Sequence, residues 1–149
     1  MTKSEIAKNF FQQGANCAQA VAAAFAPEVG MSEVELFKLA SGFGGGFGRR
    51  REVCGAVSGM VLIANMLYGN DDITDKDAKD GHYARIQKLL KEFEAQNSSL
   101  ICRELLGLDK NGETPHVSEV RTQEYYQTRP CADIVASAAE ILEKAITVS

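Results

Sequence analysis

Four cysteines are the residues of this sequence best suited to chemistry. They lie far apart along the chain, at Cys17, Cys54, Cys102 and Cys131. A thiol at the start of a helix feels the positive end of the helix dipole and loses its proton more readily, and the resulting thiolate binds metals and exchanges electrons. The flanking residues put all of them except Cys102 near the start of a predicted helix. We therefore expect the four thiols to share one site.

The elements that position these thiols are predicted to be helices. Most segments carry apolar residues at helical spacing, and no segment reads as an alternating strand. A first helix should span about 4–13, and a second, over 17–26, is nearly all Ala, Val and Phe and should be buried on most sides. Cys102 lies inside a short helical pattern. The sequence predicts one all-α domain over residues 1–149, a bundle of about seven helices with a glycine-rich loop.

Helix punctuation supports the later elements of this bundle. Ser32 with Glu35 has the spacing of a capping box, and Thr74 with Asp77 repeats it before a long amphipathic helix. A buried helix is predicted over 53–68, and a final helix is predicted over 130–146. Each of these segments ends at glycine, proline or a polar run, as helices commonly do.

Glycine is concentrated between Gly42 and Arg51, where the chain reads Gly-Phe-Gly-Gly-Gly-Phe-Gly-Arg-Arg-Arg. Neither a helix nor a strand favours so much glycine, so some backbone in this loop must approach another group closely. One interpretation places Gly44, Gly45 and Gly46 against a cofactor, with their amides donating to its sulfur atoms. Tight packing between helices is the alternative, and both stay open.

Five arginines lie beside the cysteines in sequence, namely Arg49, Arg50, Arg51, Arg103 and Arg129. Their positive charge would offset the negative charge of thiolates, although a solvated arginine face or an anion-binding loop would use the same residues. The two histidines, His82 and His116, are predicted to lie at the surface.

Composition limits the classes of function. The chain has 16 Lys and Arg against 20 Asp and Glu, so it lacks the basic surface that nucleic acid requires. Its longest apolar run, 60–67, is far shorter than the roughly 20 residues that span a bilayer, so no membrane insertion is expected. The first residues lack the apolar stretch of a signal peptide, which predicts a cytoplasmic protein. In a reducing cytosol, metal binding or transient redox chemistry is favoured over permanent disulfides.

The segment Cys54-Gly55-Ala56-Val57-Ser58-Gly59 resembles the Cys-Gly-Ala-x-x-Gly element of the C_GCAxxG_C_C family of redox proteins. The other three cysteines match the remaining family cysteines in order, and the resemblance extends to 14–20 and to the glycine-rich 43–48. It implies redox activity. The family also resembles the iron–sulfur part of certain multihaem cytochromes, but this chain has no Cys-x-x-Cys-His, so covalent haem is not implied.

Three functions remain open from the residues. The first is electron transfer through an iron–sulfur cluster, preferably [2Fe–2S], with all four cysteines as metal ligands and an unidentified redox protein as partner. The second is thiol–disulfide exchange, in which Cys54 or Cys17 attacks and a neighbour resolves. The third is an interaction module with structural zinc or with buried free thiols. Helical amphipathicity also suggests that two copies pair as a homodimer.

Overall fold

Helix α2 (Cys17–Ala24) lies at the centre of the molecule. Six of its eight residues are buried, and five of these are alanines. Because alanine side chains are short, neighbouring helices can approach α2 from several directions. It packs against α1 (Lys3–Gln12), α4 (Glu33–Ala40), α5 (Gly55–Tyr68) and α9 (Cys131–Thr147). The prediction that this helix is buried on most sides is confirmed.

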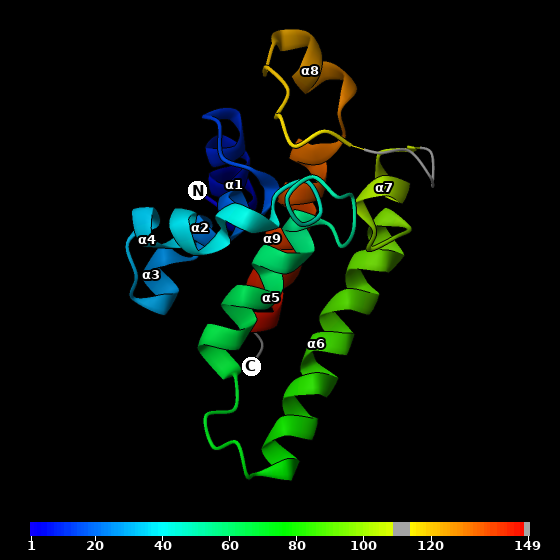
Figure 1. Cartoon of the computed structure of the whole chain (residues 1–149). Coiled ribbons are helices and arrows are strands. Elements are labelled where there is room, and N and C mark those ends of the chain that lie inside the picture. Colours follow the sequence, from blue (N-terminus) through cyan, green and yellow to red (C-terminus); the bar gives the residue numbers. More distant parts are fainter. Residues whose placement is uncertain (109–113, 148–149) are drawn as a thin grey trace.

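The computed structural model describes residues 1–108 and 114–147 (Figure 1). These residues form nine α-helices, and no strand occurs among them beyond an isolated bridge between Val53 and Ile101. The remaining elements are α3 (Ala26–Val29), the 3₁₀ turn η1 (Ser41–Phe43), α6 (Lys76–Asn97), α7 (Cys102–Leu105) and α8 (Gln123–Thr128). The all-α class is confirmed. The expected count of about seven was too low, since helices as short as α3, with four residues, show no periodicity.

Helix caps follow the sequence signals at most positions. Both reciprocal hydrogen bonds of a capping box form between Ser32 and Glu35 at the start of α4. Asn16 and Gln19 form a second box at the start of α2, and this box holds the backbone beside Cys17. The long helix α6 starts slightly later than predicted, because the Asp75 side chain accepts the capping hydrogen bond.

The contact between α2 and α5 depends on two glycines. A Cβ at Gly59 would lie 2.7 Å from the carbonyl oxygen of Ala18, and a Cβ at Gly55 would lie 3.0 Å from the carbonyl oxygen of Phe43. Real Cβ atoms do not fit at 2.7 Å, so Gly59 requires glycine. At 3.0 Å a Cβ on Gly55 would be very tight, and the Phe43 carbonyl would have to shift to accept it. The close crossing brings the start of α5 beside the start of α2, and therefore Cys54 near Cys17.

His82 is a correction to the sequence prediction. Its side chain is buried in α6, where Nε2 lies 2.7 Å from Oδ1 of Asn65 and Nδ1 lies 3.1 Å from the guanidinium of Arg85. Burial lowers its pKa, and the charge of Arg85 lowers it further. The position was predicted to be exposed because His82 follows a glycine near a helix start, where sequence gives no sign of a buried polar partner.

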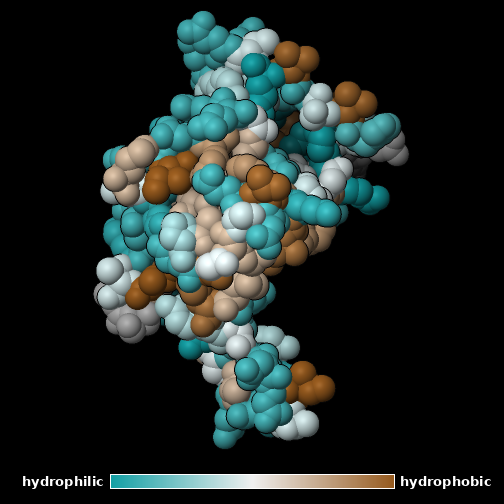
Figure 2. Space-filling view, turned by 90° about the vertical axis from the view of Figure 1, so that its left-hand side faces the viewer, coloured by the Kyte–Doolittle hydropathy of each residue, from teal (hydrophilic) through white to brown (hydrophobic). Residues whose placement is uncertain are grey.

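The surface carries separate apolar residues as well as polar ones. Figure 2 shows one side of the molecule, where tan and brown apolar atoms reach the surface between teal polar atoms. Exposed apolar residues of α4 include Val34 and Leu39. Within residues 1–108 and 114–147, no helix combines the length and the apolar composition needed to cross a bilayer. Pairing of two copies stays a prediction.

Candidate functional site

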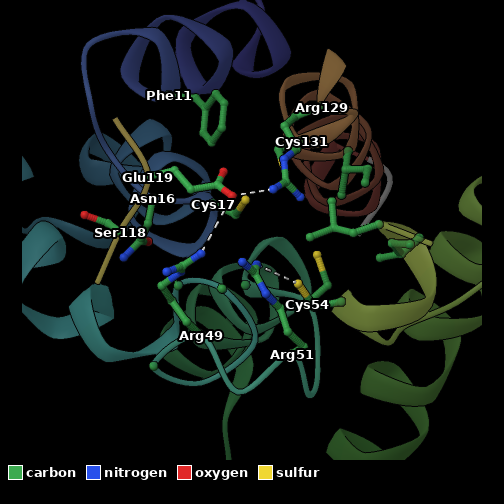
Figure 3. A pocket seen from close by; sticks show the side chains of 18 of the residues that line it. Phe11, Asn16, Cys17, Arg49, Arg51, Cys54, Ser118, Glu119, Arg129 and Cys131 are labelled. Carbon is green, nitrogen blue, oxygen red and sulfur yellow. Dashed lines mark hydrogen bonds and ion pairs between the residues drawn. The ribbon is translucent and has the colours of Figure 1, made fainter. Parts of the chain in front are cut away.

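All four cysteines line one cavity of about 270 Å³ (Figure 3). Each lies at a helix N-terminus: Cys17, Cys102 and Cys131 are the first residues of α2, α7 and α9, and Cys54 immediately precedes α5. The sequence placed Cys102 inside its helix, so this position is a correction. Ile101 has extended backbone, which delays the start of α7 to Cys102. All four thiols are free of disulfides.

Cys17 and Cys131 form one pair within this cavity. The starts of α2 and α9 meet where these two helices pack together. The pKa of Cys131 is lowered from its ordinary value of 9.0 to about 7. Hydrogen bonding with the Cys17 thiol contributes most to this shift, and the charges of Arg129, Arg51 and Arg121 add to it, whereas burial opposes it. The same hydrogen bond and burial raise the pKa of Cys17. In this pair the thiolate therefore forms on Cys131 while Cys17 stays a protonated thiol.

Cys54 and Cys102 form a second pair, aligned by the isolated bridge. The Cys54 amide donates to the Leu100 carbonyl at 2.8 Å, and the Cys102 amide donates to the Glu52 carbonyl at 2.7 Å. This short antiparallel pairing holds the starts of α5 and α7 next to each other, although 48 residues of sequence separate the two cysteines. Both side chains are buried.

Burial dominates the protonation of this second pair. It raises the pKa of Cys54 to about 12, and the amides of Ala56 and Val57 offset only part of that effect. Burial also raises the pKa of Cys102, while a hydrogen bond from Arg51 and its charge act in the opposite direction. Both groups are therefore neutral thiols at neutral pH, and a cation or metal in the cavity would be needed to deprotonate them.

The glycine-rich loop forms a left-handed turn below the cavity. Residues 45–49 and Arg51 all have positive φ, and three of them, Phe47, Arg49 and Arg51, are not glycines. Successive amides donate to carbonyls of the same loop, among them Arg51 to Gly45 and Glu52 to Gly46, each at 3.0 Å. Such a conformation is costly for residues with a Cβ and is most often retained where it serves a site.

The three predicted glycines differ in their positions. Gly44 and Gly45 line the cavity, whereas Gly46 is not among its lining residues. A Cβ at Gly44 would lie 2.4 Å from Nδ2 of Asn16, and a Cβ at Gly46 would lie 2.6 Å from the Glu52 amide. A Cβ at Gly45 would lie 2.9 Å from Cα of Arg49, so close packing explains all three glycines. Within the described residues the Gly45 amide donates no hydrogen bond.

Among the described residues, four arginines and one carboxylate line the cavity, although the whole chain has a net charge of −4. Three of the arginines, Arg49, Arg51 and Arg129, belong to the set that the sequence indicated. Arg50 is exposed, and Arg103 does not line the cavity. The local excess of positive charge favours thiolates or another anion inside.

Arg51 is the most deeply buried of these arginines, with 8% of its surface exposed. Its Nη1 donates to Sγ of Cys102 at 3.6 Å, and its Nε is buried with no hydrogen-bond partner among the described residues. A guanidinium group keeps its proton at any physiological pH. Among the described residues, Arg51 forms no ion pair with a carboxylate, and its one side-chain hydrogen bond goes to the Cys102 thiol at the cavity.

Glu119, Arg121 and Tyr125 line the cavity but were not indicated by the sequence. The guanidinium of Arg121 lies 4.2 Å from the centre of the Phe11 ring, and its Nη1 donates to the Phe11 carbonyl at 2.6 Å. Isolated charged residues in a polar segment have the same local pattern whether they face solvent or a site. No sequence signal could therefore have found them.

His116 was predicted to lie at the surface. Its side chain is exposed, as predicted, and it also lines the cavity.

The described residues contain no group of three His, Cys, Asp or Glu side chains that could hold one metal ion as they stand. The four cysteines line one cavity, but their sulfur atoms do not lie around a single position that one metal ion could occupy. A single zinc ion at about 2.3 Å from each sulfur would require them to move together.

Residues 15–145 match the family described as "Putative redox-active protein (C_GCAxxG_C_C)". The chain belongs to this family. The family label contains four cysteines, as this chain does, although it writes Gly-Cys-Ala where the chain reads Cys54-Gly55-Ala56. The four cysteines of this chain meet in the cavity. No curated protein and no solved structure matches the chain. The comparisons therefore support a redox role for this chain, at the level of the family, and no more specific function.

Proposed function

We propose that this redox protein transfers electrons through an iron–sulfur cluster held by Cys17, Cys54, Cys102 and Cys131. The observation that carries the proposal is the convergence of four thiols, from four helix N-termini, on one positively charged cavity. Four cysteines are the usual ligand set of both [2Fe–2S] and [4Fe–4S] clusters. When bound, such a cluster accepts and releases one electron at a time. Of the two, we favour [2Fe–2S].

The chain offers compensation for the negative charge of four thiolates. The N-termini of α2, α5 and α9 each present the positive end of a helix dipole to the cysteine at that end. Arg51 already donates to Cys102, and its Nε has no acceptor among the described residues. The hydrogen bond from Arg51 Nη1 stabilises the thiolate form of Cys102 as a cluster ligand.

The arrangement favours a polynuclear centre over zinc. Four ligands of one zinc ion have to approach a single point, and no three candidate ligands in the described chain do so. Ligands of a cluster bind different iron atoms, so their sulfur atoms lie farther apart.

The proposal is tested on protein purified without oxygen. Iron and acid-labile sulfide in equal amounts, with a visible absorption spectrum that bleaches on reduction, are the expected results. Electron paramagnetic resonance of the reduced protein then distinguishes [2Fe–2S] from [4Fe–4S]. Zinc alone would support the structural alternative, and a protein free of metal after anaerobic purification and reconstitution would contradict both.

Serine substitution at each cysteine identifies the ligands. Cys17→Ser, Cys54→Ser, Cys102→Ser and Cys131→Ser should each lower the iron and sulfide content. His116→Ala is the control, because this histidine lies at the same cavity but is not a proposed ligand. Loss of cluster in His116→Ala would indicate mixed ligands, and a fully loaded variant at any cysteine would exclude that residue.

Thiol–disulfide exchange is a second candidate, favoured by the pairing of Cys17 with Cys131. Cys131 has a pKa of about 7 and a neighbouring thiol, which are the properties of an attacking and a resolving cysteine. The sequence predicts Cys54 or Cys17 as the attacking group, but in the structure the pKa of both is raised. This mechanism predicts metal-free protein in which a disulfide substrate oxidises two thiols, those of Cys17 and Cys131, and is itself reduced to two thiols.

A further inference from the structure

The segment 114–122 closes the outer side of the cysteine cavity. Arg49, from the glycine-rich loop, donates through Nη1 to the carbonyl oxygens of Pro115, at 2.9 Å, and Val117. Ser118 and Glu119, from the same segment, line the cavity. The loop and this segment therefore form opposite sides of the opening, and Arg49 joins them.

Glu119 lies between two arginines at this opening (Figure 3). Its Oε1 is 2.5 Å from Nη2 of Arg129, at the start of α9, and 3.9 Å from Nη2 of Arg49. Glu119 is the one carboxylate among the described residues that line the cavity. A carboxylate held by two guanidinium groups from separate elements has the arrangement of a bound anion.

Arg51 extends this positive surface into the interior. Arg49, Arg51, Arg129 and Glu119 also line a second, more open hollow beside the opening. The Arg51 side chain is more than nine-tenths buried and lines both the cavity and this hollow, and its Nε has no acceptor among the described residues. Glu119 pairs with Arg49 and Arg129, but Nε of Arg51 is left without an acceptor among the described residues. An acceptor with several oxygen atoms could serve all three.

We propose that this opening is a binding site for a small oxyanion, a ligand of the sulfate or carboxylate class, and that Glu119 holds the site until such a ligand displaces it. Arg49 and Arg129 bind the ligand from two sides, and Arg51 donates to it from within. Such a site delivers an anionic substrate or effector to the cysteines. It does not depend on which redox centre the cysteines form, because its donors are arginines.

The probe for this site is inorganic sulfate, titrated by calorimetry into the full-length protein as purified. Sodium chloride keeps the ionic strength constant, so that screening of the arginines does not change during the titration. Glu119→Gln removes the internal competitor and should raise the affinity for sulfate by about tenfold or more. Glu124→Gln removes an equal charge from an exposed position of α8 and should bind sulfate as the parent protein does.

A second substitution identifies the donors. Adding Arg129→Gln to Glu119→Gln should abolish the gain, because one side of the site is lost. The proposal is overturned if Glu119→Gln binds sulfate no more tightly than the parent, or if the double variant keeps the gain. Glu119→Ser repeats the test with a smaller side chain, and circular dichroism verifies that each variant is folded. Iron and sulfide are measured in the same samples, so a missing cluster and a missing anion site are separate results.

Discussion

At the scale of single residues, Cys131 differs from the other three cysteines in the direction of its pKa shift. Because its pKa is lowered from 9.0 to about 7, its reactive thiolate should form at a lower pH than that of an ordinary thiol. In reduced, metal-free protein we expect alkylation of Cys131 by iodoacetamide to rise through about pH 7. Peptide mass spectrometry follows each cysteine separately.

Cys17→Ala tests the cause of this shift. It removes the hydrogen bond that contributes most, so the inflection for Cys131 should move toward 9.0. Cys54→Ala is the matched control, because the pKa of Cys54 is raised to about 12 and its thiol carries no charge near pH 7. An inflection near pH 7 that persists in Cys17→Ala would assign the shift to the arginines instead.

Arg51 and Arg50 are adjacent in sequence but differ in burial, so they form a matched pair of substitutions. Arg51 is buried against Cys102, whereas Arg50 is exposed. In the cluster-loaded protein, Arg51→Gln should lower the reduction potential by tens of millivolts, on the order of 1 kcal/mol, because a positive charge stabilises the more negative reduced state. Arg50→Gln should change it little, since solvent and salt screen an exposed charge. Equal shifts in the two variants, measured by redox titration, would contradict this assignment.

At the scale of elements, the crossing of α2 and α5 sets the positions of Cys17 and Cys54. Gly59→Ala would place a methyl group 2.7 Å from the Ala18 carbonyl oxygen, so we expect a loss of stability of about 1–3 kcal/mol in chemical denaturation. Gly81→Ala is the control within α6, where a Cβ meets nothing within 4 Å. There the better helix propensity of alanine should stabilise the protein by about 0.5–1 kcal/mol. The same effect at both glycines would show that the crossing is not tight.

At the scale of the whole molecule, the apolar core extends well beyond the cysteine cavity. The core joins buried residues of α1, α2, α4, α5, α6 and α9, and of the four cysteines only Cys54 is fully buried within it. A core of this kind can hold a domain of this length without a metal. Removing a bound metal centre should therefore leave helical circular dichroism and a cooperative thermal transition, at a lower midpoint temperature. Loss of helicity on metal removal would show that the site is required for folding.

The features that the sequence by itself determined depend on interactions between residues close together in the chain. Helical periodicity and caps depend on neighbours a few residues apart, so the all-α class, the central α2 and the box at Ser32 could be predicted. Glycine and proline punctuation likewise indicated that Cys17, Cys54 and Cys131 begin helices. The family followed from the spacing of the cysteines around Cys-Gly-Ala-x-x-Gly.

Only the tertiary structure decided which groups meet. The pairing of Cys17 with Cys131 depends on where α2 and α9 cross, and that of Cys54 with Cys102 depends on a bridge between segments about 48 residues apart. Whether Arg50 or Arg51 faces the thiols depends on a left-handed turn whose positive φ values occur at non-glycine residues. Glu119 reaches the site through ion pairs with distant arginines. These contacts arise between elements far apart in the chain, where local residue patterns carry no information about register or direction.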